Sequence, residues 1–147
     1  MLSRWLNDAT IQLATSMDDW QQALAYCARP LLDQGVITPG YLEAIQQQYR
    51  QLGPYFVLAP GLAMPHARPE QGALATGLAL LKLEQGVTFG GVEQEPVDLI
   101  ILLAAADRHS HIDALAALAE LFSSETDLAA LHAATRREEI MAIIARY

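Results

Sequence analysis

The sequence has 147 residues, of which 52% are hydrophobic and 18% are charged, so it can form one globular domain with a buried core. Acidic residues outnumber basic ones 17 to 9, which gives a formal net charge of −8, and Lys82 is the only lysine. Nucleic-acid binding relies on clustered Lys and Arg that neutralise phosphates. The composition therefore argues against a nucleic-acid partner.

The cysteine and hydropathy patterns concern the compartment. Cys27 is the only cysteine and can form no disulfide within the chain, which is typical of a reducing compartment. The longest strongly apolar run, Leu99–Ala106, is much shorter than the roughly 20 residues that span a bilayer. Residues 1–10 include Arg4 and Asp8 and lack the apolar core of a signal peptide. We therefore expect a cytoplasmic protein.

The first third of the chain predicts one strand and two helices. Thr10–Ala14 alternates as a short strand, and Ser16 is a candidate N-cap for a helix that Gly35 ends. Pro30 lies inside this helix and predicts a kink or a break. The pair Asp18-Asp19 falls in the first turn, where acids complement the helix dipole. A second amphipathic helix starts at Thr38-Pro39 and ends near Gly53.

The rest of the chain alternates strands and helices. Three apolar runs bounded by turn residues predict strands: Tyr55–Ala59, Thr76–Leu83 and Val97–Ala105. Three helix starts follow: Ser110–Asp113, Ser124–Asp127 and the capping box Thr135–Glu138. Strands mixed with helices at this length predict an α/β layer structure, a central sheet covered by helices.

His66 is the first candidate for chemistry. It lies in the segment Gly61–Glu70, between Pro65 and Pro69, which hold the backbone near extended conformations. An imidazole there can be held still and presented outward, as a nucleophile or a ligand requires. An ordinary loop histidine is the alternative that this segment leaves open.

His111 is the second candidate, because it follows the strand Val97–Ala105 at the end where α/β proteins collect ligands. If Ser110 is the N-cap, His111 occupies the first helical position, where a neutral imidazole can donate an N–H beside an anion. A purely structural role stays open at this point. His109 is expected in a turn and His132 late in a helix, both structural or merely exposed.

Other constellations have less support. His66, His109 and His111 lack carboxylates at a metal-site spacing, and Cys27 falls on an apolar helix face, so neither a metal nor a cysteine nucleophile is expected. The chain contains no Walker loop, no GxGxxG and no GxSxG motif. No cofactor is therefore expected.

The segment Gly53-Pro-Tyr-Phe-Val-Leu-Ala-Pro-Gly-Leu-Ala-Met-Pro-His-Ala-Arg-Pro-Glu70 resembles the active-site segment of enzyme IIA domains of the bacterial phosphotransferase system. The likeness is to the mannitol/fructose type, and the sequence of the segment is most similar to that of the ascorbate-specific members. It continues through Pro96–Ala104, His111 and the closing helices, so that residues 1–147 resemble one such domain.

This resemblance implies a mixed β-sheet flanked by helices on both sides and a phosphoryl-transfer function. His66 would accept a phosphoryl group from phosphorylated HPr as a tele-phosphohistidine and pass it to a cysteine of the cognate IIB protein. A membrane IIC component would bind and move the sugar. His111 matches the second active-site histidine and would stabilise the phosphoryl group. No metal or cofactor is required.

Several residues near His66 have open roles. An apolar surface formed by Tyr55, Phe56, Leu62 and Met64 would pack against a partner and exclude water from the P–N bond. Arg50 is left out of the site, because ascorbate-type members need not share an arginine there. Arg68 would screen a phosphate or be a solvated loop residue.

Three functions are compatible with the resemblance. The first is a sugar-specific phosphocarrier of the ascorbate branch. The second is a regulatory IIA homologue that signals its phosphorylation state by binding other proteins, and the third is a non-catalytic interaction domain. The transported sugar cannot be read from these residues. The hydrophobic content allows a homodimer without requiring one.

Overall fold

The computed structural model describes residues 1–90, 95–107, 109 and 111–147. In chain order the elements are η1 (Leu2–Arg4), β1 (Ile11–Ala14), α1 (Trp20–Asp33), α2 (Pro39–Leu52), β2 (Val57–Ala59), β3 (Leu62–Ala63), η2 (Pro69–Gln71), β4 (Gly77–Val87), β5 (Val97–Ala104), α3 (Ile112–Ser123), α4 (Glu125–Ala133) and α5 (Arg137–Ile144). No described helix is long and apolar enough to cross a membrane.

The strands form one mixed sheet in the order β1-β4-β5-β3-β2. β1 pairs with β4 and β3 pairs with β5 in parallel, whereas β4–β5 and β2–β3 are antiparallel. The two long apolar runs form the central strands β4 and β5, which are paired from Gly77–Ala104 to Val87–Val97 with one irregularity. Residues 77–83 of β4 and nearly all of β5 are buried on both faces, which explains why these stretches are continuous apolar runs rather than alternating ones.

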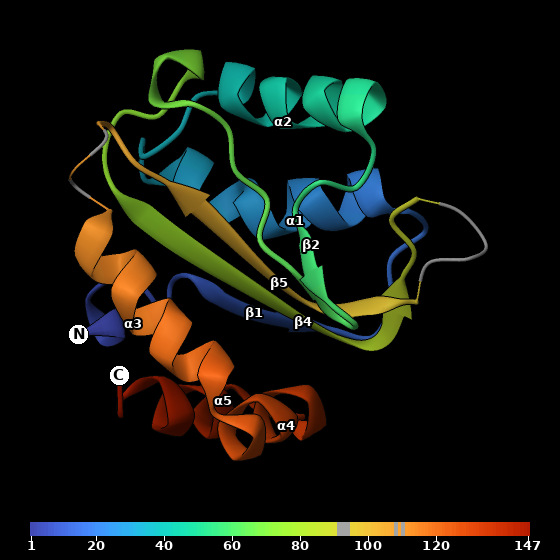
Figure 1. Ribbon diagram of the computed structural model, residues 1–147, viewed down its shortest axis with the longest axis vertical. Helices are drawn as coiled ribbons and strands as arrows, with labels where there is room; N and C mark the ends of the chain where they lie inside the picture. Colours follow the sequence, from blue (N-terminus) through green and yellow to red (C-terminus); the bar gives the residue numbers. More distant parts are fainter. Residues whose placement is uncertain (91–94, 108, 110) are drawn as a thin grey trace.

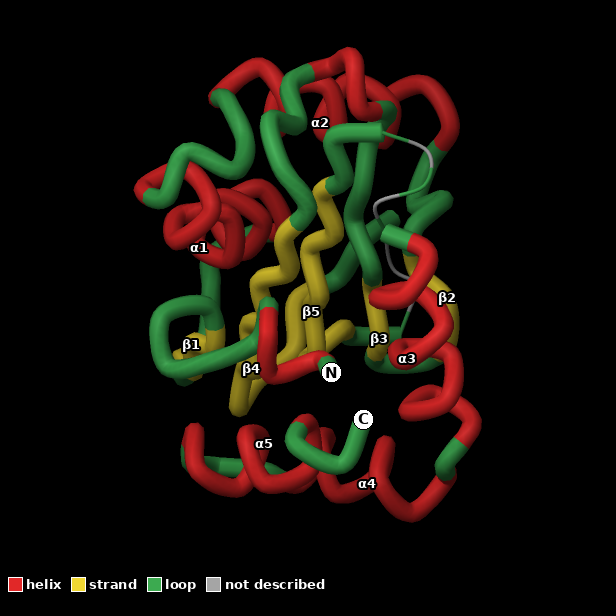
Figure 2. The backbone as a smooth tube through the Cα atoms, turned by 90° about the vertical axis from the view of Figure 1, so that its left-hand side faces the viewer, coloured by secondary structure: helices red, strands yellow, loops and turns green. Residues whose placement is uncertain are grey.

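The sheet separates two hydrophobic cores (Figures 1 and 2). On one face α1 and α2 pack against residues such as Leu81 and Ile100; on the other, α3, α4, α5 and η1 pack against residues such as Leu80 and Ile101. Successive residues of a strand point to opposite faces, so each central strand contributes to both cores. The expectation of a mixed sheet flanked by helices on both sides is confirmed.

The start and the interior of α1 differ from expectation. Asp19, not Ser16, is the N-cap: its Oδ1 accepts the N–H of Gln22 at 2.8 Å, so the acidic pair lies outside the helix. Pro30 does not break the helix, which runs on to Asp33. Proline lacks the N–H that would bond the carbonyl four residues earlier, and the Gln12 side chain donates to that Tyr26 carbonyl at 2.8 Å instead.

The other boundaries show which local signals are reliable. α2 starts after Thr38 with Pro39 in its first turn and ends at Gly53, whose φ is +76°, as expected. At α5 the capping box is shifted by one residue, since Glu139 rather than Glu138 accepts from the backbone N–H of Arg136. The sequence did not predict β3, because two residues between turns carry no strand signal; parallel pairing with β5 forms it.

Candidate functional site

The two candidate histidines follow neighbouring strands. His66 comes three residues after β3 and His111 seven residues after β5. Because β3 and β5 pair in parallel, their carboxyl ends meet at one edge of the sheet. Crevices at such ends are common ligand sites in α/β folds. The topology therefore brings together two residues that lie 45 positions apart.

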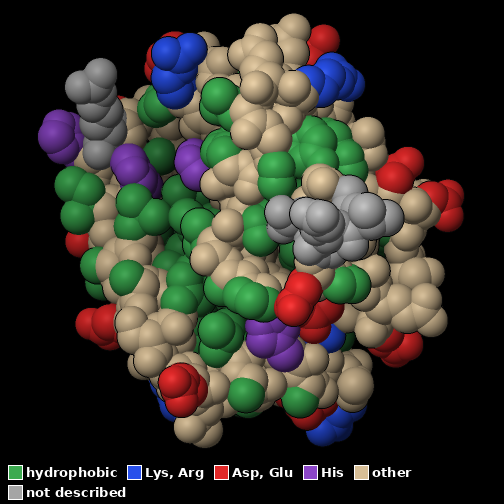
Figure 3. Space-filling view, turned by 45° about the vertical axis from the view of Figure 1, so that its right-hand side comes forward, with side chains coloured by type: hydrophobic (Ala, Val, Ile, Leu, Met, Phe, Trp, Pro, Cys, Tyr) green, Lys and Arg blue, Asp and Glu red, His purple; other side chains and the backbone are tan. Residues whose placement is uncertain are grey.

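Both histidines line the same cavity. It has a volume of about 270 Å³ and is lined by Tyr41, His66, Ala67, Arg68, Pro69, Leu103, Ala105 and His111. The space-filling view in Figure 3 shows several histidine side chains near the upper left with hydrophobic side chains beside them, and another histidine apart from this group lower on the face. The cavity is open at the surface, so that a group on a partner protein can reach it.

The orientation of the His66 ring is fixed by a contact within its own loop. Nδ1 of His66 lies 2.9 Å from the carbonyl oxygen of Met64. A carbonyl oxygen only accepts, so Nδ1 carries the proton and the neutral ring keeps its lone pair on Nε2. The backbone of the same loop is tied to the sheet, because the N–H of Leu103 donates to the Pro65 carbonyl at 3.1 Å. The result is a half-buried imidazole whose Nε2 keeps a free lone pair.

His111 lies at the start of α3, one position earlier than expected. It is the N-cap residue itself, and its side chain makes no capping hydrogen bond. The prediction that it occupies the first helical position is therefore wrong, and the Ser110 cap on which that prediction depended lies outside the described residues. Nδ1 of His111 is buried and has no hydrogen-bond partner among the described residues. Buried polar atoms are nearly always paired, which makes this nitrogen a candidate contact for a bound group.

Two tyrosines hold the His66 loop: Tyr55, expected only as apolar surface beside His66, and Tyr41, which the sequence did not indicate. Tyr41, on α2, is 1% exposed, and Tyr55 lies in the turn before β2 with its ring edge-on to His66, 5.7 Å between centroids. Burial raises the pKa of Tyr41, and burial together with the nearby Tyr41 raises the pKa of Tyr55 to about 12. Both hydroxyls therefore keep their protons at neutral pH and act as donors.

The apolar surface expected around His66 is smaller than predicted. Phe56 and Leu62 are 0% and 2% exposed and belong to the cores, so they cannot pack against a partner. Tyr55 and Met64 are half-buried, and Leu52 is exposed beside His66 in a second groove between α2 and the loop.

The arginines near the site differ in position. Arg68 lines the cavity with a side chain 71% exposed, and its Nε lies 3.5 Å from Glu70. Arg50 is exposed on α2 and lines neither the cavity nor the groove beside it. Of these two arginines, Arg68 is therefore the one placed to contact a phosphate in the cavity.

The remaining candidates lie outside the cavity. His109 is exposed in the turn before α3, as expected. Cys27 is fully buried on α1, where its thiol contacts the Ala79 carbonyl at 3.5 Å, and burial raises its pKa from 9.0 to about 12. A thiol that stays protonated is a poor nucleophile, so Cys27 is a core residue as predicted.

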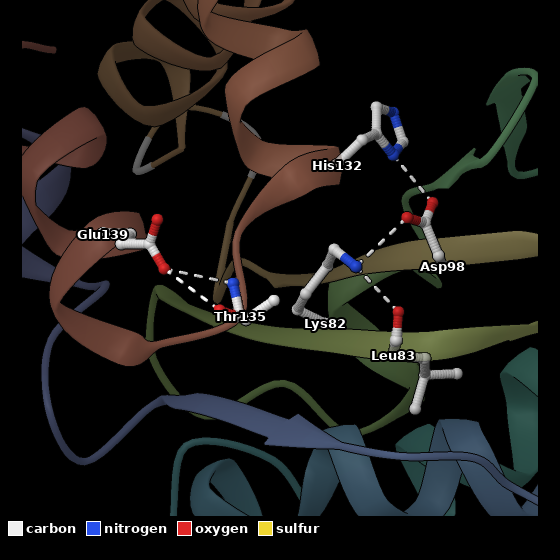
Figure 4. A network of polar contacts seen from close by, with 6 residues as sticks. All are labelled: Lys82, Leu83, Asp98, His132, Thr135 and Glu139. Carbon is white, nitrogen blue, oxygen red and sulfur yellow. Dashed lines mark hydrogen bonds and ion pairs between the residues drawn. The ribbon is translucent and has the colours of Figure 1, made fainter.

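A polar network at the other end of β5 was not predicted (Figure 4). Nζ of Lys82, with a side chain 6% exposed, lies 3.2 Å from Asp98 and donates to the Leu83 carbonyl at 2.7 Å. Nδ1 of His132, on α4, donates to the other oxygen of Asp98 at 2.7 Å. His132 is thus an oriented, structural residue. A lysine inside the apolar run of β4 was the sequence signal for a buried ion pair.

Comparison with known proteins decides the family. Residues 4–147 match the family described as "Phosphoenolpyruvate-dependent sugar phosphotransferase system, EIIA 2". The chain belongs to this family. The expectation of a phosphotransferase component of the enzyme IIA type is confirmed.

Two curated enzyme IIA relatives differ in the system that they name. The mannitol-specific cryptic phosphotransferase enzyme IIA component of Escherichia coli K12 is 46% identical over 145 residues, covering 99% of this chain and 98% of the relative. The ascorbate-specific EIIA component of Shigella boydii is 38% identical over 138 residues, covering 93% and 90%. The mannitol-type relative is thus more similar than the ascorbate-type one, and ascorbate specificity is not established.

Solved enzyme IIA structures share the fold. The solution structure of the mannitol-specific cryptic enzyme IIA from Escherichia coli has a TM-score of 0.92 at 45% identity and covers 99% of both chains. The Escherichia coli complex of mannitol enzyme IIA with phosphorylated enzyme IIB has a TM-score of 0.81, covering 96% of this chain and 97% of that one. At 23% identity the second likeness shows the fold alone.

Proposed function

We propose that the protein is a phosphocarrier that accepts a phosphoryl group on Nε2 of His66 and passes it to a partner protein. The observation that carries the proposal is the contact between His66 Nδ1 and the Met64 carbonyl, which leaves the Nε2 lone pair free in an open cavity. The resemblance gives the donor as phosphorylated HPr and the acceptor as a cysteine of a IIB component, which serves a membrane IIC component.

The chemistry needs little beyond position and charge. The Nε2 lone pair of His66 attacks phosphorus in line, a new N–P bond forms, and the N–P bond of the donor histidine breaks, leaving its lone pair on the donor nitrogen. Nδ1 of His66 keeps its proton throughout, held by the Met64 carbonyl, and this contact stabilises the positive charge of the phosphorylated ring. In the second step a IIB thiolate attacks, the P–S bond forms, and the lone pair returns to Nε2.

His111 is proposed to stabilise the phosphoryl group. It lines the same cavity, and it begins a 12-residue helix whose N-terminal end carries partial positive charge. Anions bind readily at such helix ends, and a preorganised donor there stabilises the charge that spreads over the equatorial oxygens during transfer. Charge stabilisation of this kind requires no metal ion.

The names of similar proteins support a sugar phosphotransferase role. One structural neighbour is a mannitol enzyme IIA bound to phosphorylated enzyme IIB, and the curated relatives carry mannitol- or ascorbate-specific names. The ascorbate assignment remains a prediction from the resemblance. Single-turnover transfer from the phosphorylated protein to a mannitol-type and to an ascorbate-type IIB tests it, and faster transfer to the mannitol-type protein would overturn it.

Intact-mass measurement tests the phosphocarrier proposal. After incubation with enzyme I, HPr and phosphoenolpyruvate, we expect the wild type to gain one phosphoryl group that is labile in acid and stable in base. His66→Gln should gain none, whereas the matched control His109→Gln, in the exposed turn, should be labelled like the wild type. Labelling of His66→Gln would refute the acceptor. Full labelling of the wild type without transfer to any IIB would favour the regulatory alternative.

A further inference from the structure

One peptide group next to His66 is held from both sides by tyrosine hydroxyls. The hydroxyl of Tyr55 lies 2.6 Å from the carbonyl oxygen of His66. The N–H of Ala67, which belongs to the same peptide group, donates to the hydroxyl oxygen of Tyr41 at 3.0 Å. The carbonyl and the N–H of one planar unit are therefore both bound, and the plane cannot rotate without breaking a hydrogen bond.

The two tyrosines are themselves fixed. The hydroxyl of Tyr41 donates to the carbonyl of Leu103 in β5 at 2.7 Å, which ties the peptide group to the central sheet. The hydroxyl of Tyr55 has a second acceptor, Oε1 of Gln48 on α2, at 2.9 Å. One hydroxyl proton serves one acceptor at a time, and the shorter distance favours the His66 carbonyl.

The peptide groups on either side of His66 are thus both immobilised. The Pro65 carbonyl before it accepts from Leu103, and the His66–Ala67 group after it is held by the tyrosines. The Nδ1 contact to the Met64 carbonyl then fixes the last free rotation, that of the ring. In-line attack on phosphorus depends on the direction of the Nε2 lone pair, and a misplacement of the attacking atom by about 1 Å can cost roughly 100-fold in rate.

We infer that Tyr41 and Tyr55 are positioning residues for phosphoryl transfer: they hold the His66–Ala67 peptide group and so aim Nε2 of His66 at the incoming phosphorus. Neither hydroxyl needs to touch the phosphoryl group. The inference rests on the proposed function. It states that the two hydroxyls increase the rate of phosphoryl transfer and do not contribute to the affinity for the partner protein.

The test is the removal of each hydroxyl with the ring retained. Tyr41→Phe and Tyr55→Phe delete the hydrogen bonds and keep the packing, including the edge contact of residue 55 with His66. Tyr49→Phe is the matched control: Tyr49 also lies on α2, packs against Trp20 with ring centroids 4.0 Å apart, and has no hydroxyl hydrogen bond among the described residues. Phosphoryl uptake from phosphorylated HPr is measured as kcat and KM, together with the final extent of labelling.

We expect Tyr41→Phe and Tyr55→Phe each to lower kcat about tenfold, with KM within about twofold of the wild type and the final labelling still one group per chain. Nitrogen NMR of the His66 ring should show a smaller fraction of the Nδ1–H form in Tyr55→Phe. Tyr49→Phe should match the wild type in every measurement. A merely structural role would lower the free energy of unfolding without moving kcat or the ring tautomer.

Each outcome decides the inference. Wild-type kcat in both folded variants, or a loss confined to KM, would overturn it. Should the buried Tyr41→Phe fail to fold, the half-buried Tyr55→Phe decides the question alone, through its kcat and ring tautomer. Absence of labelling on His66 in the wild type would overturn the proposed function itself, which is a different result from normal labelling with unchanged kcat in the variants.

Discussion

The buried ammonium of Lys82 allows a prediction that does not depend on the function. Asp98→Ala removes the carboxylate that lies 3.2 Å from Nζ of Lys82 and leaves the Leu83 carbonyl as the remaining partner, among the described residues, of a side chain only 6% exposed. It also releases His132 on α4 from its contact at 2.7 Å. Breaking a buried pair by removing one partner typically costs about 3–5 kcal/mol, because the other charge stays buried without compensation.

The size of the effect follows from burial. Asp98 is 23% exposed, so water screens the pair in part, and we expect the lower end of the range, about 3 kcal/mol. For a chain of this length that loss lowers Tm by roughly 6–12 °C. The double variant Lys82→Met/Asp98→Ala removes both charges and should recover more than half of the loss, because no charge remains buried.

Urea unfolding followed by circular dichroism measures these differences. Glu70→Ala is the control, since it removes a carboxylate from the exposed Arg68–Glu70 pair, whose side chains are 71% and 68% exposed; little change is expected. The reasoning is refuted if Asp98→Ala loses less than about 1 kcal/mol, or if Lys82→Met/Asp98→Ala is as unstable as Asp98→Ala.

Three further predictions concern the site, the thiol and one turn. His111→Ala should still be phosphorylated on His66 but pass the group to IIB roughly 10²–10³ times more slowly, as single-turnover transfer would show; a near-wild-type rate would leave His111 a structural residue. Because burial raises the pKa of Cys27 from 9.0 to about 12, the stability that the protonated thiol provides is present below pH 9 and lost as pH rises to 12, on the order of 4 kcal/mol. Between pH 9 and pH 12 the free energy of unfolding, measured with urea, should therefore fall less in Cys27→Ala than in the wild type. An equal fall in both proteins would contradict this. Gly61→Ala, at φ +82° with a Cβ only 3.0 Å from His132, should be destabilised by about 2 kcal/mol or more; Gly53→Ala, at φ +76° in open space, shares the backbone strain without the contact and should lose less.

Local chemistry predicted much of the fold. Pro39 and Gly53 marked both ends of α2, and Ser124 capped α4 with its hydroxyl accepting from Asp127 at 3.2 Å. Local signals failed where a distant side chain intervened. Pro30 alone predicts a kink or a break, whereas the helix continues to Asp33, and the Gln12 amide that replaces the missing N–H comes from a strand residue 18 positions away. At α5 two adjacent residues could serve as the capping glutamate, and only the structure distinguishes Glu139 from Glu138.

The site was predictable as far as its motif extends. His66 and His111 were candidates from their local positions, the resemblance to a family implied their roles, and the parallel pairing of β3 with β5 explains why they share a cavity. Tyr41 was not predictable, because its contacts to Ala67 and Leu103 span 26 and 62 residues. These hydrogen bonds depend on the order of the strands in the sheet, which no spacing of residues along the sequence indicates.

The strand β5 joins two regions that differ in chemistry. Asp98 near its start belongs to the ion-pair network, whereas Leu103 near its end anchors Tyr41 and Pro65 beside His66. Five residues of extended strand separate these positions by about 17 Å, beyond the range over which substitutions usually couple. Changes at the two ends should therefore add. A variant stabilised near Lys82 could therefore carry destabilising substitutions near His66 and still fold. Such a stabilised background would allow the hydroxyls of Tyr41 and Tyr55 to be removed one at a time.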